Sequence, residues 1–187
     1  TTATSLTRGV TLHGIQSWVA LPDGHEDDAP AFHHHPAATL PLIENRGVSL
    51  RVIAGEAFRQ RSPVVAASPM LYVDVAMTAD SRFEFPAEHE ERAVYVVDGT
   101  VQIAGTAVAS GQLASLTPGV TTGIHASAAA RLMLLGGARF PTPRHIHWNF
   151  VASTQQRLDA AGQAWRVRNR ERFPDVPGDD QEFMPLP

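Results

Sequence analysis

Hydrophobic and polar positions alternate in short runs through the middle of the chain. In the run MLYVDVAM, Leu71, Val73 and Val75 recur at every second position, as in a strand with one buried face. The pair Asp98-Gly99 predicts a tight hairpin, because glycine accepts a positive φ. Closely spaced short strands are typical of a closed or double-sheet β fold. The expected strands are 48–54, 70–77, 93–97, 100–104, 106–109, 112–116, 120–125 and 130–136.

The segments before this region have a different pattern. Residues 10–21 are mostly apolar and predict one long strand. Residues 22–47 contain several prolines and the histidine run 33–35. Proline interrupts regular hydrogen bonding, so we expect an irregular loop that lies on a surface.

The C-terminal pattern changes again after the last of these strands. The run 145–151 predicts a strand, and a helix is expected to follow it. Ser153 fits the N-cap position and Gln156 the third helical position of a capping box, and we expect the helix to end near Arg172. Its apolar stripe at helical spacing consists of Leu158, Ala161 and Trp165.

The composition narrows the chemistry and the partners. The 187 residues include no cysteine and no lysine, which excludes thiol catalysis, iron–sulfur clusters, disulfides and lysine Schiff bases. The net charge of -4 gives no basic face, so no nucleic-acid partner is expected. No apolar stretch has the length of a membrane-spanning helix, and the first residues lack the core of a signal peptide. We therefore expect a cytoplasmic protein without a membrane partner.

Several stretches of the sequence, in family order, resemble the C-terminal half of the pirin family. They cover nearly the whole chain from Leu12 onward. The stretches are LHGIQSWVALP (12–22), AFHHHPAATLP (31–41), RVIAGEAF (51–58), SPMLYVDV (68–75), PAEHEERAVYVVDGTVQIAG (86–105), ARLMLLGGA (130–138), RHIHWNFVAS (144–153) and RFPDVPGDDQEFMPLP (172–187).

The resemblance implies a fold and a division of the chain. Pirins are bicupins, in which two small β-barrels pack face to face and a helix follows the second barrel. We therefore expect an all-β fold, a cupin-type β-barrel (double-stranded β-helix or jelly roll) with a C-terminal α-helix. Residues 1–47 would be an N-terminal strand and a Pro/His-rich connecting loop left from the N-terminal lobe, 48–140 the C-terminal cupin barrel, and 141–187 a strand, helix and extended tail.

The resemblance also implies where the cofactor and the partners belong. The family metal, usually iron, lies in the N-terminal barrel, held by a His-x-His pair and a later His and Glu. In the family that barrel precedes the LHGIQ segment, and this chain begins just before LHGIQ. The resemblance therefore assigns none of those ligands to a residue of this sequence. We expect no cofactor in this chain and iron, or another divalent metal, in an N-terminal lobe. That lobe or a second copy of the chain is the expected partner, with regulatory proteins as a further class. Without the lobe, Trp18, Trp148 and Trp165 would form exposed apolar surface.

A second metal site in this lobe would need the general cupin pattern of histidines, a glutamate and a last histidine. Such ligands must converge from neighbouring strands on the barrel interior. Counted from Gly99, the glutamate position falls on Arg92 and the His-x-His positions fall on Pro86 and Glu88; counted from Pro118-Gly119, the last histidine position is Thr122. We therefore expect a barrel without a structural metal and without catalytic residues.

Two alternative metal sites stay open. A site slipped by one residue would use His89, Glu91 and His125, although such a slip turns a strand's side chains to the opposite face. The pair His145 and His147 has the spacing of two ligands on one strand face.

The sequence supports three hypotheses for function. In the first, this lobe is non-catalytic and completes a bicupin, whose full-length form is a quercetin 2,3-dioxygenase or a redox-responsive regulatory protein. In the second, the chain is a protein-interaction or transcriptional-regulator module without catalysis. In the third, it is a small metalloenzyme that uses the histidines of this lobe. Fold alone does not decide among these functions.

Overall fold

The computed structural model describes residues 13–175, 178 and 183–187. The chain forms two compact units, Leu21–Pro143 and the combination of Thr1–Ala20 with Arg144–Pro187. Each unit is described by itself.

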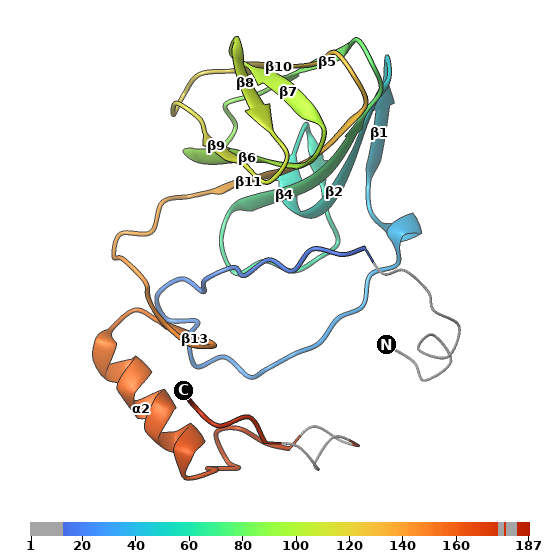
Figure 1. The fold of residues 1–187 in the computed structure, drawn as a ribbon. Coiled ribbons are helices and arrows are strands. Elements are labelled where there is room, and N and C mark those ends of the chain that lie inside the picture. The colour runs from blue at the N-terminus through green and yellow to red at the C-terminus, as the bar shows by residue number, and fades with distance from the viewer. Residues whose placement is uncertain (1–12, 176–177, 179–182) are drawn as a thin grey trace. The chain divides into compact units, whose positions relative to one another are not determined.

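The unit Leu21–Pro143 is built from two antiparallel sheets that lie one above the other (Figure 1). The seven-stranded sheet has the order β1-β2-β4-β11-β6-β9, with β3 paired to β2, and the four-stranded sheet has the order β5-β10-β7-β8. A short 3-10 helix, η1 (Ala37–Thr39), precedes them. The strands are β1 (Leu42–Asn45), β2 (Val48–Ala57), β3 (Gln60–Arg61), β4 (Met70–Met77), β5 (Ser81–Phe85), β6 (Glu91–Asp98), β7 (Thr100–Ile103), β8 (Thr106–Ala109), β9 (Leu113–Ser115), β10 (Thr122–Ala126) and β11 (Ala130–Gly137).

The core fills the space between the two sheets. Val73 on β4 and Leu134 on β11 are fully buried from the larger sheet, and Phe85 on β5 and Ile124 on β10 are buried from the smaller one. Each such side chain contributes roughly 1.5–3 kcal/mol by leaving water. Along β4 every second residue is buried, which confirms the alternation predicted from the sequence. The expected cupin-type all-β fold is thus confirmed.

Three strands of the barrel unit were not expected from the sequence. They are β1, β3 and β5. In β5 the alternation is present, since Ser81 and Phe85 are buried and Arg82 and Glu84 are exposed. This strand is hard to recognise by its hydrophobic pattern, because its first buried residue is a serine and two of its five residues are charged.

The long strand expected over residues 10–21 is wrong for the part that the structure describes. Residues 13–21 have no regular secondary structure, and residues 10–12 lie outside the described chain. Strands are held by hydrogen bonds to a neighbour, and no described strand pairs with this segment. An apolar run alone was not enough to predict a strand here.

The single strand expected over 145–151 is a hairpin of two strands. These are β12 (His145–His147) and β13 (Phe150–Ala152), joined through Trp148, whose φ is 50°. A bulky residue rarely adopts this left-handed backbone conformation, so no turn was predicted at this position.

The helix α2 (Gln155–Arg166) begins one residue later and ends about six residues earlier than the sequence indicated. Its N-cap is Thr154 rather than Ser153, and the Thr154 hydroxyl accepts a hydrogen bond from the Arg157 backbone N–H at 3.3 Å. The helix ends at Arg166 rather than near Arg172.

Two of the three tryptophans, Trp148 and Trp165, pack in an aromatic cluster instead of forming open apolar surface. Trp148 and Trp165 are half-buried, with ring centroids 5.3 Å apart, and the Trp165 indole N–H donates to the Met184 carbonyl at 2.8 Å. Trp18, by contrast, is 52% exposed. The cluster consists of Trp148, Phe150, Trp165, Phe173 and Phe183.

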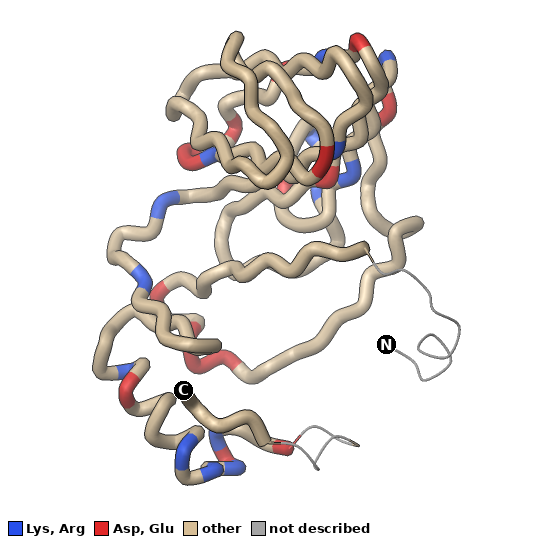
Figure 2. Tube along the Cα trace, in the orientation of Figure 1, with Lys and Arg blue, Asp and Glu red and all other residues tan. Residues whose placement is uncertain are grey.

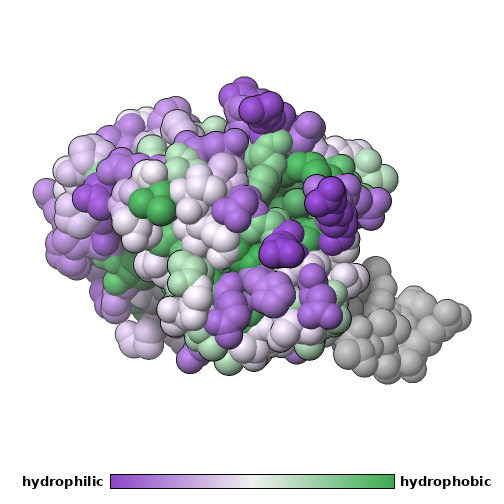
Figure 3. Space-filling view, turned by 90° about the horizontal axis from the view of Figure 1, so that it is seen from above, coloured by the Kyte–Doolittle hydropathy of each residue, from purple (hydrophilic) through white to green (hydrophobic). Residues whose placement is uncertain are grey.

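Charged residues on the barrel unit are interleaved rather than gathered by sign (Figure 2). Arg131 on β11 donates two hydrogen bonds of 2.9 Å to the Asp74 carboxylate on β4, and this pair raises the pKa of Arg131. The face in Figure 3 likewise mixes hydrophilic side chains with patches of hydrophobic ones. Among the described helices, none has the length and apolarity to cross a membrane.

Two glycines with the same φ of +72° predict different costs of a side chain. A Cβ at Gly55 would overlap the backbone carbonyl of Met70, whereas a Cβ at Gly119 meets no atom within 4 Å. Gly119→Ala should lower the free energy of unfolding by about 1 kcal/mol, from backbone strain alone. Gly55→Ala should lower it by about 3 kcal/mol or more, because the backbone must also move. Urea denaturation measures both, and equal losses would contradict this packing of β2 against β4.

Candidate functional site

Arg92 occupies the position where the cupin ligand pattern places a carboxylate, and its side chain is buried in the barrel. It is the second residue of β6 and only 4% exposed. Gly136 on β11 lies opposite. A Cβ at Gly136 would overlap the Glu91 backbone oxygen and come within 3.2 Å of the Arg92 Cγ, so the glycine lets β6 and the arginine side chain approach closely.

The Arg92 guanidinium is held by backbone carbonyls from two loops. Nη1 donates to the Phe85 and Pro86 carbonyls at 3.3 and 3.0 Å, and Nη2 donates to the Thr117 and Val120 carbonyls at 2.8 Å each. Its Cζ also lies 5.2 Å from the centroid of the Phe85 ring, within the range of a cation–π interaction. Burial lowers the pKa of Arg92 through desolvation, yet a guanidinium stays protonated in proteins. A fixed positive charge therefore lies inside this barrel.

The residues at the cupin ligand positions do not fit a divalent metal ion. Pro86 has no donor atom in its side chain, and the Thr122 hydroxyl donates to a backbone carbonyl at 3.2 Å. The Glu88 carboxylate accepts a hydrogen bond of 2.9 Å from the Phe58 N–H. The Nε of Arg92 is buried without a hydrogen-bond partner among the described residues, and such an N–H suits an acceptor rather than a cation. The guanidinium would repel a dication from this position.

The structure does not bring His89, Glu91 and His125 together. His89 is hydrogen-bonded to the Glu56 carbonyl at 2.8 Å, and Glu91 forms an ion pair with Arg139 at 2.9 Å. His125 is exposed on β10, between buried neighbours, so it points away from the core. Over the described residues, no three His, Asp or Glu side chains are grouped so that they could hold a metal ion.

His145 and His147 lie two residues apart on β12, as the sequence indicated. His145 is opposite Ala152 and His147 opposite Phe150 in the hairpin. His145 is half-buried and His147 exposed. Neither belongs to a group of three candidate ligands in the described chain.

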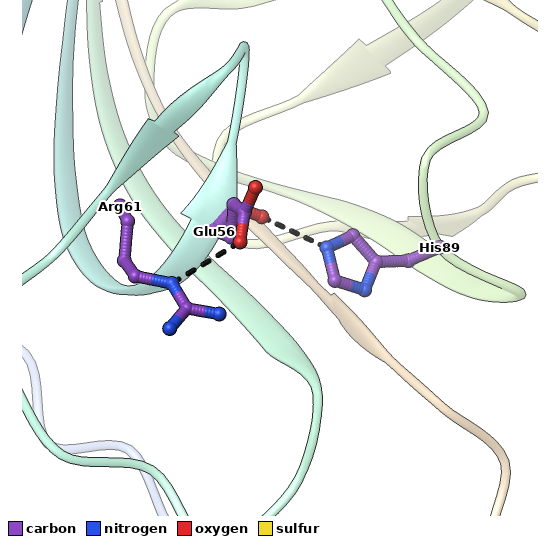
Figure 4. A network of polar contacts seen from close by, with 3 residues as sticks. All are labelled: Glu56, Arg61 and His89. Carbon is purple, nitrogen blue, oxygen red and sulfur yellow. Dashed lines mark hydrogen bonds and ion pairs between the residues drawn. The ribbon is translucent and has the colours of Figure 1, made fainter.

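A polar network surrounds the β2–β3 hairpin at one end of the barrel unit (Figure 4). The Arg61 Nε donates to the Glu56 carboxylate at 3.2 Å, and the His89 Nε2 lies 2.8 Å from the Glu56 backbone oxygen. A carbonyl oxygen can only accept, so this His89 nitrogen carries the proton. The Glu56 side chain is 57% exposed.

The turn of this hairpin has a strained backbone. Phe58 and Arg59 have φ values of 53° and 60°, as a two-residue hairpin turn requires, but neither is the usual glycine or asparagine. The Phe58 N–H is bonded to Glu88, and the Phe58 ring packs 6.1 Å from Phe85 and 6.2 Å from Phe83. These contacts hold the turn, which sequence reasoning missed because Phe-Arg is not a turn signal.

Replacing Arg92 tests how far the barrel depends on its internal cation. Arg92→Met keeps most of the volume but removes the four hydrogen bonds to these carbonyls, and it should lower the free energy of unfolding by about 2–4 kcal/mol. Arg82→Met, at an exposed site on β5, should change it by less than about 0.5 kcal/mol. Urea denaturation measures both. A stable Arg92→Met protein would show that the carbonyls do not need the guanidinium.

Comparisons with known proteins agree with this architecture. The protein-family model described as the pirin C-terminal cupin domain matches residues 72–172 of the sequence. A pirin-like protein of Caulobacter vibrioides is 41% identical over 180 residues, covering 96% of this chain and 61% of that protein. Pirin of Rattus norvegicus is 26% identical over 156 residues, covering 80% of this chain and 54% of that protein.

Among solved structures, quercetin 2,3-dioxygenase from Acinetobacter baumannii superposes with a TM-score of 0.81 at 32% sequence identity, covering 91% of this chain and 56% of that one. The chain thus spans between half and two thirds of the length of these relatives. With its cupin-type barrel, its C-terminal helix and a domain match over more than half of its residues, the chain belongs to the pirin family.

Proposed function

We propose that this chain is a non-catalytic cupin lobe in which the Arg92 guanidinium takes the place of a metal ion. The observation that carries the proposal is the set of four backbone carbonyls around that guanidinium. Carbonyl dipoles from two loops stabilise a cation at the barrel interior, as metal ligands would, but this cation is covalently part of the chain.

The lobe would act by completing a bicupin. In that arrangement iron belongs to another lobe, and this barrel contributes a rigid surface that covers the metal lobe's cavity. The similarity to a protein named quercetin 2,3-dioxygenase supports a flavonol dioxygenase activity for the complete protein. The residues of this lobe would bind and shape the interface, because the described ones include no group of three His, Asp or Glu side chains able to hold a metal ion.

A second candidate function is a protein-interaction module. Its support is the segment before the barrel, where Ile15, Trp18 and Val19 are 48%, 52% and 56% exposed without regular secondary structure. Three large apolar side chains so close together favour contact with another protein surface. The other lobe of a bicupin or a second copy of this chain would cover them, and a regulatory partner is the alternative.

Metal analysis of the purified chain tests the first proposal. We expect far less than one equivalent of iron, nickel or copper after purification with added metal, because a dication would have to displace the guanidinium. Dioxygen uptake with quercetin should stay at the level of free metal in buffer. Stoichiometric metal, or quercetin-dependent uptake abolished by a chelator, would overturn the proposal.

A variant that restores the ligand pattern provides the matched positive control. The combined substitutions Pro86→His, Glu88→His, Arg92→Glu and Thr122→His would place the cupin donor set on the same backbone. If the ligand positions converge as the contacts of Arg92 indicate, this variant should bind one equivalent of Ni²⁺ or Co²⁺ by calorimetry. A correctly folded variant without metal affinity would show that these positions do not converge.

A further inference from the structure

A cavity of about 900 Å³ lies beside the β2–β3 hairpin, outside the interior site of Arg92. We call it the hairpin cavity. It is bounded by Gly55 and Glu56 at the end of β2, by Arg59 and Arg61 of the hairpin, and by the loops 62–70 and 88–89. All of these residues belong to the barrel unit. Its volume is within the range of small-molecule sites.

One wall of the hairpin cavity is apolar. The loop 62–70 contributes small and aliphatic side chains, among them Pro63, Val64, Pro69 and Met70. Val65 in the same loop is 84% exposed, although it is a large apolar side chain. A flat apolar body placed against this wall would remove such surface from water.

The hairpin side of the cavity presents guanidinium N–H donors that no described residue uses, while its two arginines and two glutamates balance in formal charge. The Glu88 carboxylate accepts from the Phe58 N–H, and the Glu56 carboxylate pairs with the Arg61 Nε only. The Nη donors of Arg61 are left over from that pair. Arg59 has no hydrogen bond or ion pair with any described residue. Guanidinium groups bind carboxylates through two parallel N–H bonds, which makes this wall suited to an organic acid.

Backbone strain at the same place supports a binding role. A side chain at positive φ costs free energy, and Asn or Gly would adopt the conformation more easily than Phe58 or Arg59. Strained residues that are held by their surroundings occur preferentially at ligand sites. The contacts of the Phe58 ring and N–H hold the turn in place. The turn therefore holds Arg59 at the edge of the hairpin cavity.

We propose that the hairpin cavity binds a small organic carboxylate with a flat apolar body, with Arg59 as the principal carboxylate-binding residue. Arg61 contributes its free Nη donors, and the loop 62–70 contacts the apolar body. This inference goes beyond the proposed function, since it needs neither a metal nor a second lobe. It gives the non-catalytic barrel a ligand site through which a metabolite could act on the complete protein.

Benzoate is the probe, and its neutral analogue benzamide is the control for charge. A ligand of this size should bind with a Kd of about a millimolar. In nitrogen-15 NMR spectra of the chain, about 10 mM benzoate should shift the backbone resonances of residues 55–70 in a saturable way, whereas benzamide should shift them much less.

Two arginines at positive φ allow a matched pair of variants. Arg59→Asn removes the carboxylate partner and relieves strain, while Arg46→Asn makes the same change at φ 45° in the exposed β1–β2 turn, away from the hairpin cavity. Both variants should raise Tm by about 2 °C. Arg59→Asn should weaken benzoate binding by about fivefold or more, and Arg46→Asn should leave it unchanged.

Three results would overturn the inference. The first is a wild-type spectrum that does not change at about 10 mM benzoate, ten times the expected Kd. The second is equal binding of benzoate and benzamide, and the third is equal loss of binding in both variants. Because none of these measurements involves metal or quercetin, their failure is distinguishable from failure of the proposed function.

Discussion

The buried Arg92 guanidinium is the interaction on which the barrel end depends. Its four carbonyl partners belong to the end of β5, to the residue after it and to the segment before β10, so one side chain of β6 links the two sheets. A charge in such a place is costly unless its donors are satisfied. Here backbone carbonyls satisfy the two Nη groups and the Phe85 ring lies beside the guanidinium, with no carboxylate involved, while Nε has no partner among the described residues. The barrel thus keeps an interior cation while holding no group of residues suited to a metal among those described.

The presence of arginine at a position where metal-binding cupins have a glutamate shows how much of the site was predictable. Counting from Gly99 put Arg92 at the carboxylate position, and that count needs only the sequence. What Arg92 contacts could not be predicted, because the Thr117 and Val120 carbonyls are more than twenty residues away and reach it only through the closure of the barrel. The histidines were ambiguous for the same reason. His89 is hydrogen-bonded to the Glu56 carbonyl. His125 points away from the core, and this direction follows only from the strand register.

The fold was easier to predict from the sequence than the site was, and the predictions that were wrong have physical causes. Strands with one buried face, such as β4, follow from periodicity alone. The segment 13–21 is as apolar as a strand, but a strand also needs a partner, which an apolar pattern does not encode. Turns at Phe58-Arg59 and at Trp148 were missed because tertiary contacts hold those residues at positive φ against their preference. The division of the chain at residues 47 and 140 stays a prediction.

The account therefore separates two roles within one barrel. The interior is closed by an internal cation, and the cavity beside the β2–β3 hairpin is lined by the apolar loop 62–70 and by arginines with unused N–H donors. The most direct test of the central claim is a crystal structure of the protein grown with iron, with anomalous diffraction measured at the iron absorption edge. We predict density for the Arg92 guanidinium among four carbonyls and no anomalous peak inside this barrel. A strong peak there, surrounded by imidazole nitrogens, would contradict the account.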